Sequence, residues 1–210
     1  MQYDLFHIPC RYDSVDDLVR HLSGLTDDPL SSAGTRVVVY RGAVDAPLMI
    51  VGEAPGAEED RLGKPFVGPS GQLLDQILRC VDIDPERQAF VTNVAFRRPP
   101  GNRRPTPDEV DYYRPYLMEL IRLVDPVVIM LAGAAAVESV LRDTRPMNKI
   151  RGQWFPWNGR WAMPVFHPAY LLRNQSREPG SPKALMWTDI REVRRLLTEQ
   201  GALVGADTHR

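Results

Sequence analysis

The chain of 210 residues has few of the features that mark secreted or membrane proteins. It contains two cysteines, Cys10 and Cys80, which lie far apart and suggest no disulfide framework, so we expect reduced thiols. No apolar run approaches the roughly 20 residues needed to cross a bilayer. The first residues lack the basic start and apolar stretch of a secretory signal. We therefore expect a cytoplasmic protein that does not contact a membrane.

The chain also has little net charge. Its 26 Lys and Arg residues and 27 Asp and Glu residues give −1, so the total charge does not indicate a polyanionic ligand. The charges are spread unevenly, however. The loop FRRPPGNRR at residues 96–104 carries four arginines and no acid, and a second loop carries Arg173, Arg177 and Lys183. Local patches form phosphate sites, although either loop alone could be ordinary protein surface.

Short apolar runs alternate with amphipathic runs along most of the chain. The apolar runs at 48–51, 89–94 and 127–131 predict strands, and the amphipathic runs between them predict helices. This alternation favours a mostly parallel sheet with helices on both faces. Asn158 and Gly159 predict a hairpin turn between two further strands.

We expect one domain in three parts. Residues 1–45 form an N-terminal helical extension, 46–200 form the core, and 201–210 form a tail that we expect to be frayed.

The segment from Leu48 to Gly71 is the most informative stretch. Its apolar run stops at a glycine, and Glu53 follows directly. Asn93 ends the next predicted strand, and His167 follows the last one. Because parallel strands present their carboxyl ends at one edge of a sheet, these side chains are predicted to converge on a candidate site. The alternative is that no functional site exists here, and that the segment is a glycine-rich connection with solvated acids and a structural histidine.

Three long segments resemble the signature segments of family 4 uracil-DNA glycosylases. They read VGEAPGAEEDRLGKPFVGPSGQLLDQIL from position 51, TNVAFRRPPGNRRPTPDE from position 92 and FHPAYLLRNQSREPGSPK from position 166. They occur in the order and spacing of that family, and the resemblance covers roughly residues 45–200. It implies a three-layer α/β/α sandwich with a central, mostly parallel sheet of about four strands. It also implies an enzyme that flips uracil out of DNA and hydrolyses its glycosidic bond without cutting the strand.

The resemblance assigns roles to the residues at the strand ends. Glu53 would place the attacking water or stabilise the sugar cation, two roles that the sequence does not separate. His167 would donate to the uracil O2 as negative charge develops there. Asn93 would pair with the Watson–Crick edge of uracil and reject cytosine, whose exocyclic group replaces an acceptor by a donor. The side chain of Phe66 would stack on the flipped base or, alternatively, plug the core under the loop. Backbone groups of Gly52 and Ala54 would add contacts to the base.

The third segment resembles the DNA-intercalation loop of the family. An apolar wedge and an arginine can fill the gap that an extruded nucleotide leaves. The candidates for this loop are Pro168, Leu171, Leu172 and Arg173, and the sequence does not say which of them enters the duplex. The leucines could instead pack the first turn of a helix. The candidate phosphate contacts, which would position the strand without reading its sequence, are Arg98, Asn102, Ser181 and Lys183.

The chain departs from the family at the positions of its iron–sulfur cluster. Family 4 enzymes typically hold a [4Fe-4S] cluster on four cysteines, and His7, Cys10, Arg97 and Tyr113 stand at those positions here. Four thiolate ligands cannot come from two cysteines, so we expect no cluster and no other cofactor. Cys80 lies on a different predicted helix and is expected to be a small core residue. Aromatic packing and arginine pairing are expected to hold the corner instead.

Three functions follow from this combination. The first is an active, cluster-free uracil-DNA glycosylase of base excision repair, a monomer found with the nucleoid and acting on single- or double-stranded DNA. The second is a catalytically silent DNA- or partner-binding module that kept the fold. The third is a glycosylase with broader specificity for deaminated bases. Retention of Glu53, Phe66, Asn93 and His167 favours the enzyme, because a silent module does not need all four.

Overall fold

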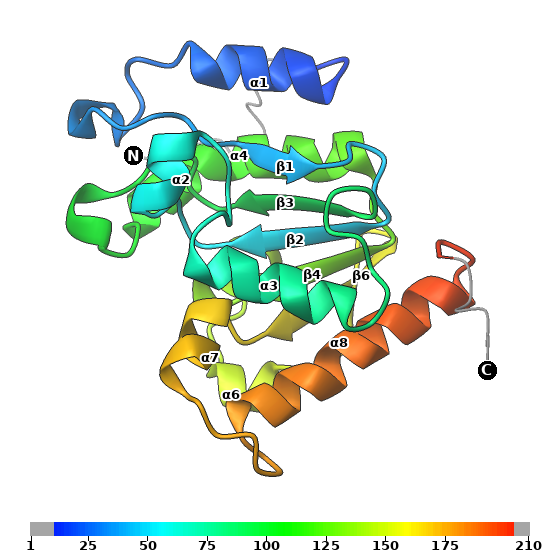
Figure 1. The fold of residues 1–210 in the computed structure, drawn as a ribbon. Coiled ribbons are helices and arrows are strands. Elements are labelled where there is room, and N and C mark those ends of the chain that lie inside the picture. The colour runs from blue at the N-terminus through cyan, green and yellow to red at the C-terminus, as the bar shows by residue number, and fades with distance from the viewer. Residues whose placement is uncertain (1–10, 204–210) are drawn as a thin grey trace.

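The computed structural model describes residues 11–203, which form one six-stranded sheet covered by helices on both faces (Figure 1). The strands run in the order β1-β3-β2-β4-β6-β5. Their bounds are β1 Tyr40–Gly42, β2 Leu48–Gly52, β3 Ala89–Asn93, β4 Val128–Ala132, β5 Phe155–Trp157 and β6 Arg160–Val165. The four central strands, β3, β2, β4 and β6, pair in parallel, and the two edge strands pair antiparallel. The central part of the sheet therefore matches the prediction, and two short edge strands add to it.

The edge strand β1 changes the expected character of the N-terminal part. Residues 1–45 were predicted to be helical, but Tyr40–Gly42 pair with β3 as part of the sheet. A strand of three residues is too short to show a periodic pattern in the sequence. Its extended conformation is fixed by its pairing with β3. The edge strand β5 is joined to β6 by the predicted turn, where Asn158 and Gly159 have φ of 47° and 78°. These positive angles are the backbone that an Asn-Gly hairpin turn requires.

Helices begin where the sequence supplies caps. Ser14 accepts a hydrogen bond from the backbone of Asp17 at the start of α1, and Thr106 and Glu109 form a capping box at the start of α4. The helices are α1 Val15–Ser23, α2 Ala57–Leu62, α3 Pro69–Arg79, α4 Pro107–Val124, α5 Ala134–Leu141, α6 Met147–Ile150, α7 Pro168–Arg173 and α8 Pro182–Glu199. Two short 3₁₀ turns lie at Ser31–Ala33 and Pro100–Asn102.

The core is split by the sheet into two apolar clusters. One lies under α1, α4 and α5 and includes Leu18, Leu117 and Val137. The other lies under α3, α7 and α8 and includes Leu74 and Ile190. Figure 1 shows α3 and α8 crossing one face of the sheet, with α4 on the other. The layers are those of an α/β/α sandwich.

Two local predictions were wrong. Cys80 is exposed at the C-terminal end of α3, because the helix ends at Arg79 and turns the thiol outward. The tail was expected to fray from residue 201, yet Leu203 is buried with 6% of its surface exposed and packs in the second cluster. Residues 204–210 of that tail lie outside the described residues.

Candidate active site

The carboxyl ends of three parallel strands bring the predicted polar residues to one edge of the sheet. Asn93 ends β3 and stands directly opposite Gly52, the last residue of β2. Glu53 follows Gly52, and its carbonyl accepts a hydrogen bond from Ala95 at 3.2 Å. His167 follows β6, two strands further along the sheet. In α/β proteins this edge is where ligands bind.

Gly52 packs directly against two candidate residues. A Cβ at this glycine would stand 2.4 Å from Cζ of Phe66 and 2.5 Å from Oδ1 of Asn93, so only glycine leaves room for both. Asn93 has 1% of its surface exposed, and its Oδ1 has no hydrogen-bond partner within the described part of the chain. A buried acceptor without a partner costs free energy, and native proteins seldom keep one without a reason. The geometry therefore fits a ligand that donates a hydrogen bond beside the Phe66 ring.

The loop that carries Phe66 is held from three sides. The Glu59 carboxylate accepts backbone N–H bonds from Gly56 at 3.1 Å, Val67 at 2.9 Å and Gly68 at 2.7 Å. Arg41 on β1 donates to the Pro65 carbonyl at 3.0 Å. Gly71 on α3 lies against the Phe66 backbone, where a Cβ would be 1.7 Å from the carbonyl oxygen.

Glu59 is an exception to the alternative in which the acids of this segment are only solvated. The acids of this segment were considered as solvated side chains, whereas this one stabilises the loop at the site. Residues 57–62, where no helix was predicted, form α2, which carries Glu59 to its partners. Phe66 itself has φ of 54°, a left-handed conformation that is uncommon for a large side chain. Such a conformation persists only where the surroundings fix it.

His167 lies beside Phe66, with 5.6 Å between their ring centroids. Gly133, which follows β4, leaves space for it, because a Cβ there would be 3.3 Å from the histidine Cβ. The Nδ1 atom of His167 accepts a hydrogen bond from the Ala169 N–H at 3.1 Å and caps α7. Burial, and to a smaller extent the charge of Arg173, lowers the pKa of His167 to about 4. The ring is therefore neutral at neutral pH, with its proton on Nε2, where it can be donated in a hydrogen bond.

Glu53 borders a small cavity of about 150 Å³ between the β3–α4 loop and α5. Burial raises the pKa of its carboxyl, and the guanidinium of Arg104 opposes this shift. The two side chains are 3.8 Å apart, from Nε of Arg104 to Oε2 of Glu53. Arg104 was counted in the basic loop but was not selected as a site residue, since nothing in the local sequence distinguishes it from its neighbours.

The helix α7 separates the two candidate wedge leucines. Leu171 is buried, with 1% of its surface exposed, and packs in the core cluster under α3 and α8. For Leu171 this burial agrees with the alternative that a leucine packs the first turn of the helix, and its contact with DNA stays a prediction. Leu172 is half-buried and Arg173 is exposed, while Pro168 is buried in the first turn. Leu172 and Arg173 remain available to a duplex.

The predicted phosphate contacts have partners within the chain. Arg98 donates to the Asn102 side chain at 2.6 Å, so two of the predicted residues bind each other. Ser181 caps α8 by accepting from the Ala184 N–H at 3.4 Å. Lys183 donates to Gln175 at 2.6 Å. The Arg98 and Lys183 contacts are exposed, so a phosphate can compete for these donors, whereas the Ser181 cap is part-buried.

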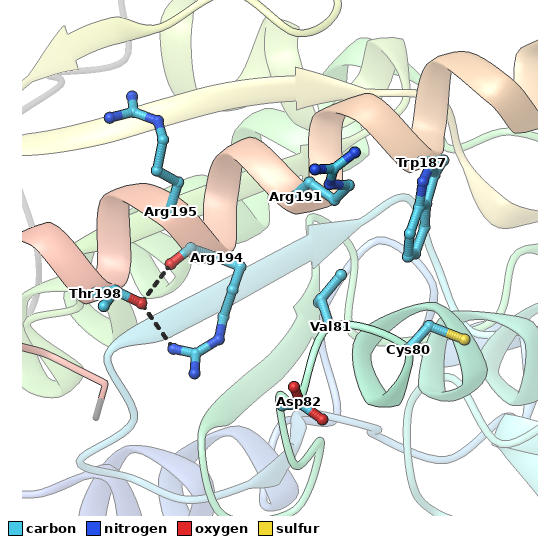
Figure 2. Close-up of a pocket in the computed structure, with 8 residues that line it drawn as sticks. All are labelled: Cys80, Val81, Asp82, Trp187, Arg191, Arg194, Arg195 and Thr198. Atoms are coloured by element: carbon cyan, nitrogen blue, oxygen red, sulfur yellow. Dashed lines mark hydrogen bonds between the residues drawn. The ribbon is translucent and has the colours of Figure 1, made fainter. Parts of the chain in front are cut away.

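A larger hollow of about 370 Å³ lies away from this edge, between the end of α3 and α8 (Figure 2). Arg194 and Thr198 bond each other there, and Arg195 points away from them. The Arg195 guanidinium bonds Glu192 and Glu199 on its own helix. None of the predicted site residues lines this hollow, so it does not belong to the candidate site.

Comparison with known proteins gives the family. The sequence model of the Uracil DNA glycosylase superfamily matches residues 39–191. The chain belongs to this superfamily. It is 38% identical over 175 residues to the type-4 uracil-DNA glycosylase of Thermotoga maritima, covering 82% of this chain and 89% of that protein. It is 34% identical over 176 residues to the type-4 uracil-DNA glycosylase of Archaeoglobus fulgidus, covering 79% of this chain and 87% of that protein. It is 30% identical over 192 residues to the type-4 uracil-DNA glycosylase of Sulfurisphaera tokodaii, covering 88% of this chain and 85% of that protein.

The family resemblance drawn from the three segments is thereby confirmed, together with the α/β fold that it implied. The match begins at residue 39, just before β1, in agreement with the pairing of that strand into the sheet. No helix among residues 11–203 is long and apolar enough to span a membrane.

The corner where type-4 glycosylases typically hold a cluster carries side chains that do not suit iron. Arg97 donates to Asp28 at 2.8 Å and to the Leu25 carbonyl at 2.7 Å, and it also bonds the Thr35 carbonyl. Tyr113 donates its hydroxyl to the same Asp28 carboxylate. Burial, followed by this hydrogen bond, raises the pKa of Tyr113, which keeps the hydroxyl protonated.

Neither a guanidinium nor a protonated phenol replaces a thiolate ligand. Asp28, Arg97 and Tyr113 are called the corner network below. His7 and Cys10, the other two positions, lie outside the described residues. The expected arginine pairing is present on the described side of the corner, and its acidic partner, Asp28, was not predicted.

Proposed function

We propose that this protein removes uracil from DNA by hydrolysing the N-glycosidic bond, as the names of its type-4 relatives indicate for them. The observation that carries the proposal is the unpartnered Oδ1 of Asn93, buried against Gly52 and Phe66. Uracil offers an N3–H donor to this oxygen and an O4 acceptor to the same amide. Cytosine has an unprotonated N3 and a donor at position 4, so it would leave the buried oxygen unpaired.

The remaining roles follow from position and protonation. His167 would donate from Nε2 to the uracil O2, because its Nδ1 already accepts from the Ala169 N–H. A neutral donor stabilises the charge that develops on the leaving uracil. Glu53 would supply the carboxylate near the sugar or the attacking water, and Phe66 would form a wall against the base. Gly52 and Ala54, at the end of β2, would add backbone contacts to the base.

We propose that Leu172 and Arg173 enter the space left by the flipped nucleotide, with Leu171 anchoring α7 to the core. Arg98 and Lys183 would exchange their present acceptors for phosphates, and Asn102 and Ser181 would donate to phosphates from the side-chain amide and the hydroxyl. Two lysines occur in the signature segments, Lys64 and Lys183, but Lys64 is exposed and Lys183 bonds Gln175. This fits hydrolysis without strand cleavage. We expect a monomer that works at chromosomal DNA, since a base-flipping enzyme of this size needs no second subunit.

A glycosylase assay tests the function. Purified protein is incubated with single- and double-stranded oligonucleotides containing one uracil, and abasic sites are cleaved with alkali. We expect product from uracil strands and none from matched cytosine strands. No product from either uracil substrate, with folded protein, would favour the silent DNA-binding module. Parallel hypoxanthine and xanthine strands measure the breadth of specificity.

We also propose that the protein works without an iron–sulfur cluster, with the corner network in its place. The support is chemical, since two cysteines cannot supply four thiolates and two ligand positions hold engaged arginine and tyrosine side chains. Protein purified without oxygen from iron-supplemented cells is analysed for iron, acid-labile sulfide and visible absorbance. We expect none of the three, and Cys10→Ser should leave activity unchanged. A brown protein with stoichiometric iron would overturn this proposal.

A further inference from the structure

The arginines of the β3–α4 loop differ in how firmly they are held. Arg97 is fixed in the corner network, and Arg103 forms two hydrogen bonds with Glu109 at 2.8 and 2.6 Å. Arg98 bonds Asn102. Arg104 has 84% of its side chain exposed and makes the 3.8 Å contact with Glu53. Charge-assisted hydrogen bonds are about 2.7–2.9 Å long, so this contact is loose and easily exchanged.

The backbone that carries Arg104 is nevertheless fixed. Its carbonyl accepts a hydrogen bond from the Arg103 guanidinium at 2.9 Å, and the capping box of α4 begins two residues later, at Thr106. The side chain therefore extends from a rigid base toward Glu53, with its guanidinium in solvent. Such an arrangement lets the guanidinium change partners without moving the loop.

Glu53 faces other charged groups across the same cavity. Asp111, Glu138 and Arg142 also line it, and Arg142 is paired with Asp111 at 3.0 Å. His167, at the same edge of the sheet, is neutral at neutral pH. Among the described residues lining the cavity, Arg104 is therefore the cation that compensates the Glu53 carboxylate. Removing this cation would leave an acidic cavity.

We propose that Arg104 is a positioning residue that exchanges Glu53 for a DNA phosphate when the substrate binds. In the free protein its guanidinium is the counter-ion of the Glu53 carboxylate. The sugar that Glu53 serves is flanked by phosphates, so the extruded nucleotide brings an anion to the exposed guanidinium. Once Arg104 has moved, Glu53 is left uncompensated while positive charge grows on the sugar. An unpaired carboxylate stabilises that charge better than a paired one.

This inference rests on the proposed function and has a distinct kinetic signature. The pH profile of kcat/KM reports the free enzyme, and that of kcat reports the complex with DNA. In Arg104→Gln the free enzyme loses the cation, which raises the pKa of Glu53 further. Because the ionised carboxylate is the active form, the acid limb of kcat/KM should move to higher pH. The acid limb of kcat should stay in place, because Arg104 has already left Glu53 in the complex.

The experiment compares wild type, Arg104→Gln, Arg104→Lys and the control Arg61→Gln, an exposed arginine on α2 that pairs with Glu58. Rates on a uracil-containing single strand are measured across pH and salt concentration, with Glu53→Gln identifying the acid limb that belongs to Glu53. We also expect the slope of log affinity against log salt to fall by about 0.7 in Arg104→Gln, the loss of one phosphate contact on a single strand. Arg104→Lys should restore both properties in part.

Two results would overturn the inference. Equal shifts of both acid limbs would mean that Arg104 stays with Glu53 in the complex. Unshifted limbs with an unchanged salt slope would mean that Arg104 is an ordinary surface charge. An inactive wild-type protein would instead contradict the proposed function, so the two failures are distinguishable.

Discussion

Asp28 and Asn93 are both buried polar residues, with 2% and 1% of their surface exposed, but their hydrogen bonding differs. The Asp28 carboxylate accepts from Arg97, Tyr113 and the Leu30 N–H, so several donors share it. Asn93 leaves its side-chain oxygen without a partner within the described part of the chain. A satisfied buried group stabilises a fold, whereas an unsatisfied one keeps a binding place for something else. The comparison separates the corner network from the active site on physical grounds.

The largest effect is expected from breaking the corner network. Asp28→Asn removes the carboxylate and leaves Arg97 buried without its counter-ion, which should cost about 3–5 kcal/mol of unfolding free energy. For a chain of this size that corresponds to a fall in Tm of about 10 °C. Thermal unfolding of Asp28→Asn and of the exposed neighbour Asp27→Asn measures the difference. Equal Tm values for the two variants would contradict a structural role for the network.

The corresponding change at the site should remove activity. Asn93→Asp replaces the amide donor by an acceptor that repels the uracil O4, so uracil release should fall by about 100-fold or more. Tm should also fall, because the new carboxylate would stand unpaired at a position with 1% of its surface exposed, so the rates are measured well below the unfolding transition. Single-turnover rates and Tm are compared with those of Asn148→Asp on α6. An active Asn93→Asp variant would remove the basis of the base-recognition role.

A smaller effect is expected at Glu59. Its carboxylate bonds only the backbone of the loop, but this loop lies at the site. Glu59→Gln removes the charge that holds Gly56, Val67 and Gly68, and each such bond contributes about 1.5 kcal/mol or more. The Phe66 ring should lose its fixed position, and kcat/KM should fall about ten-fold. Glu58→Gln on the same helix is the matched control, since that side chain is exposed and pairs with Arg61. Equal rates for both variants would show that Glu59 does not order the loop.

The smallest effect concerns His167 and pH. Its pKa is about 4 in the folded protein and about 6.5 when unfolded, so the unfolded state binds more protons between these values. Folding stability from this group is therefore complete above about pH 6.5 and is lost as the pH falls toward 4. In His167→Asn, which can still cap α7 but does not titrate here, Tm should fall less between pH 7 and pH 4.5. Parallel slopes would contradict a buried neutral histidine.

Much of the site could be predicted because local sequence sets it. Glu53, Asn93 and His167 follow apolar runs, and the rule for parallel strands places such residues at one edge. Ser14 and Thr106 cap their helices through the same kind of local signal, a hydrogen-bonding side chain directly ahead of the helix. The roles assigned to these site residues stay predictions until the rates are measured.

Residues missed by the sequence depend on distant partners. Asp28 meets Arg97 and Tyr113 across 69 and 85 positions of sequence, and no pattern near Asp28 announces this. Glu59 and Arg104 look like any acid or arginine in a charged loop. The burial of Leu171 has the same origin, since the docking of α7 decides which leucine is buried. Side-chain pairing and helix docking are set by the tertiary structure, and the periodicity of the sequence does not reveal them.

Gly71 carries a consequence for how the pocket binds. With α3 pressed onto the backbone of Phe66, the ring is ordered before any DNA arrives, so stacking on a base spends little conformational entropy. The same rigidity limits size, because a ring that cannot retreat leaves little room for the second ring of a purine. We therefore expect hypoxanthine and xanthine to be poor substrates. A Gly71→Ala variant, forced to displace the loop, should lose selectivity between pyrimidines and purines along with affinity.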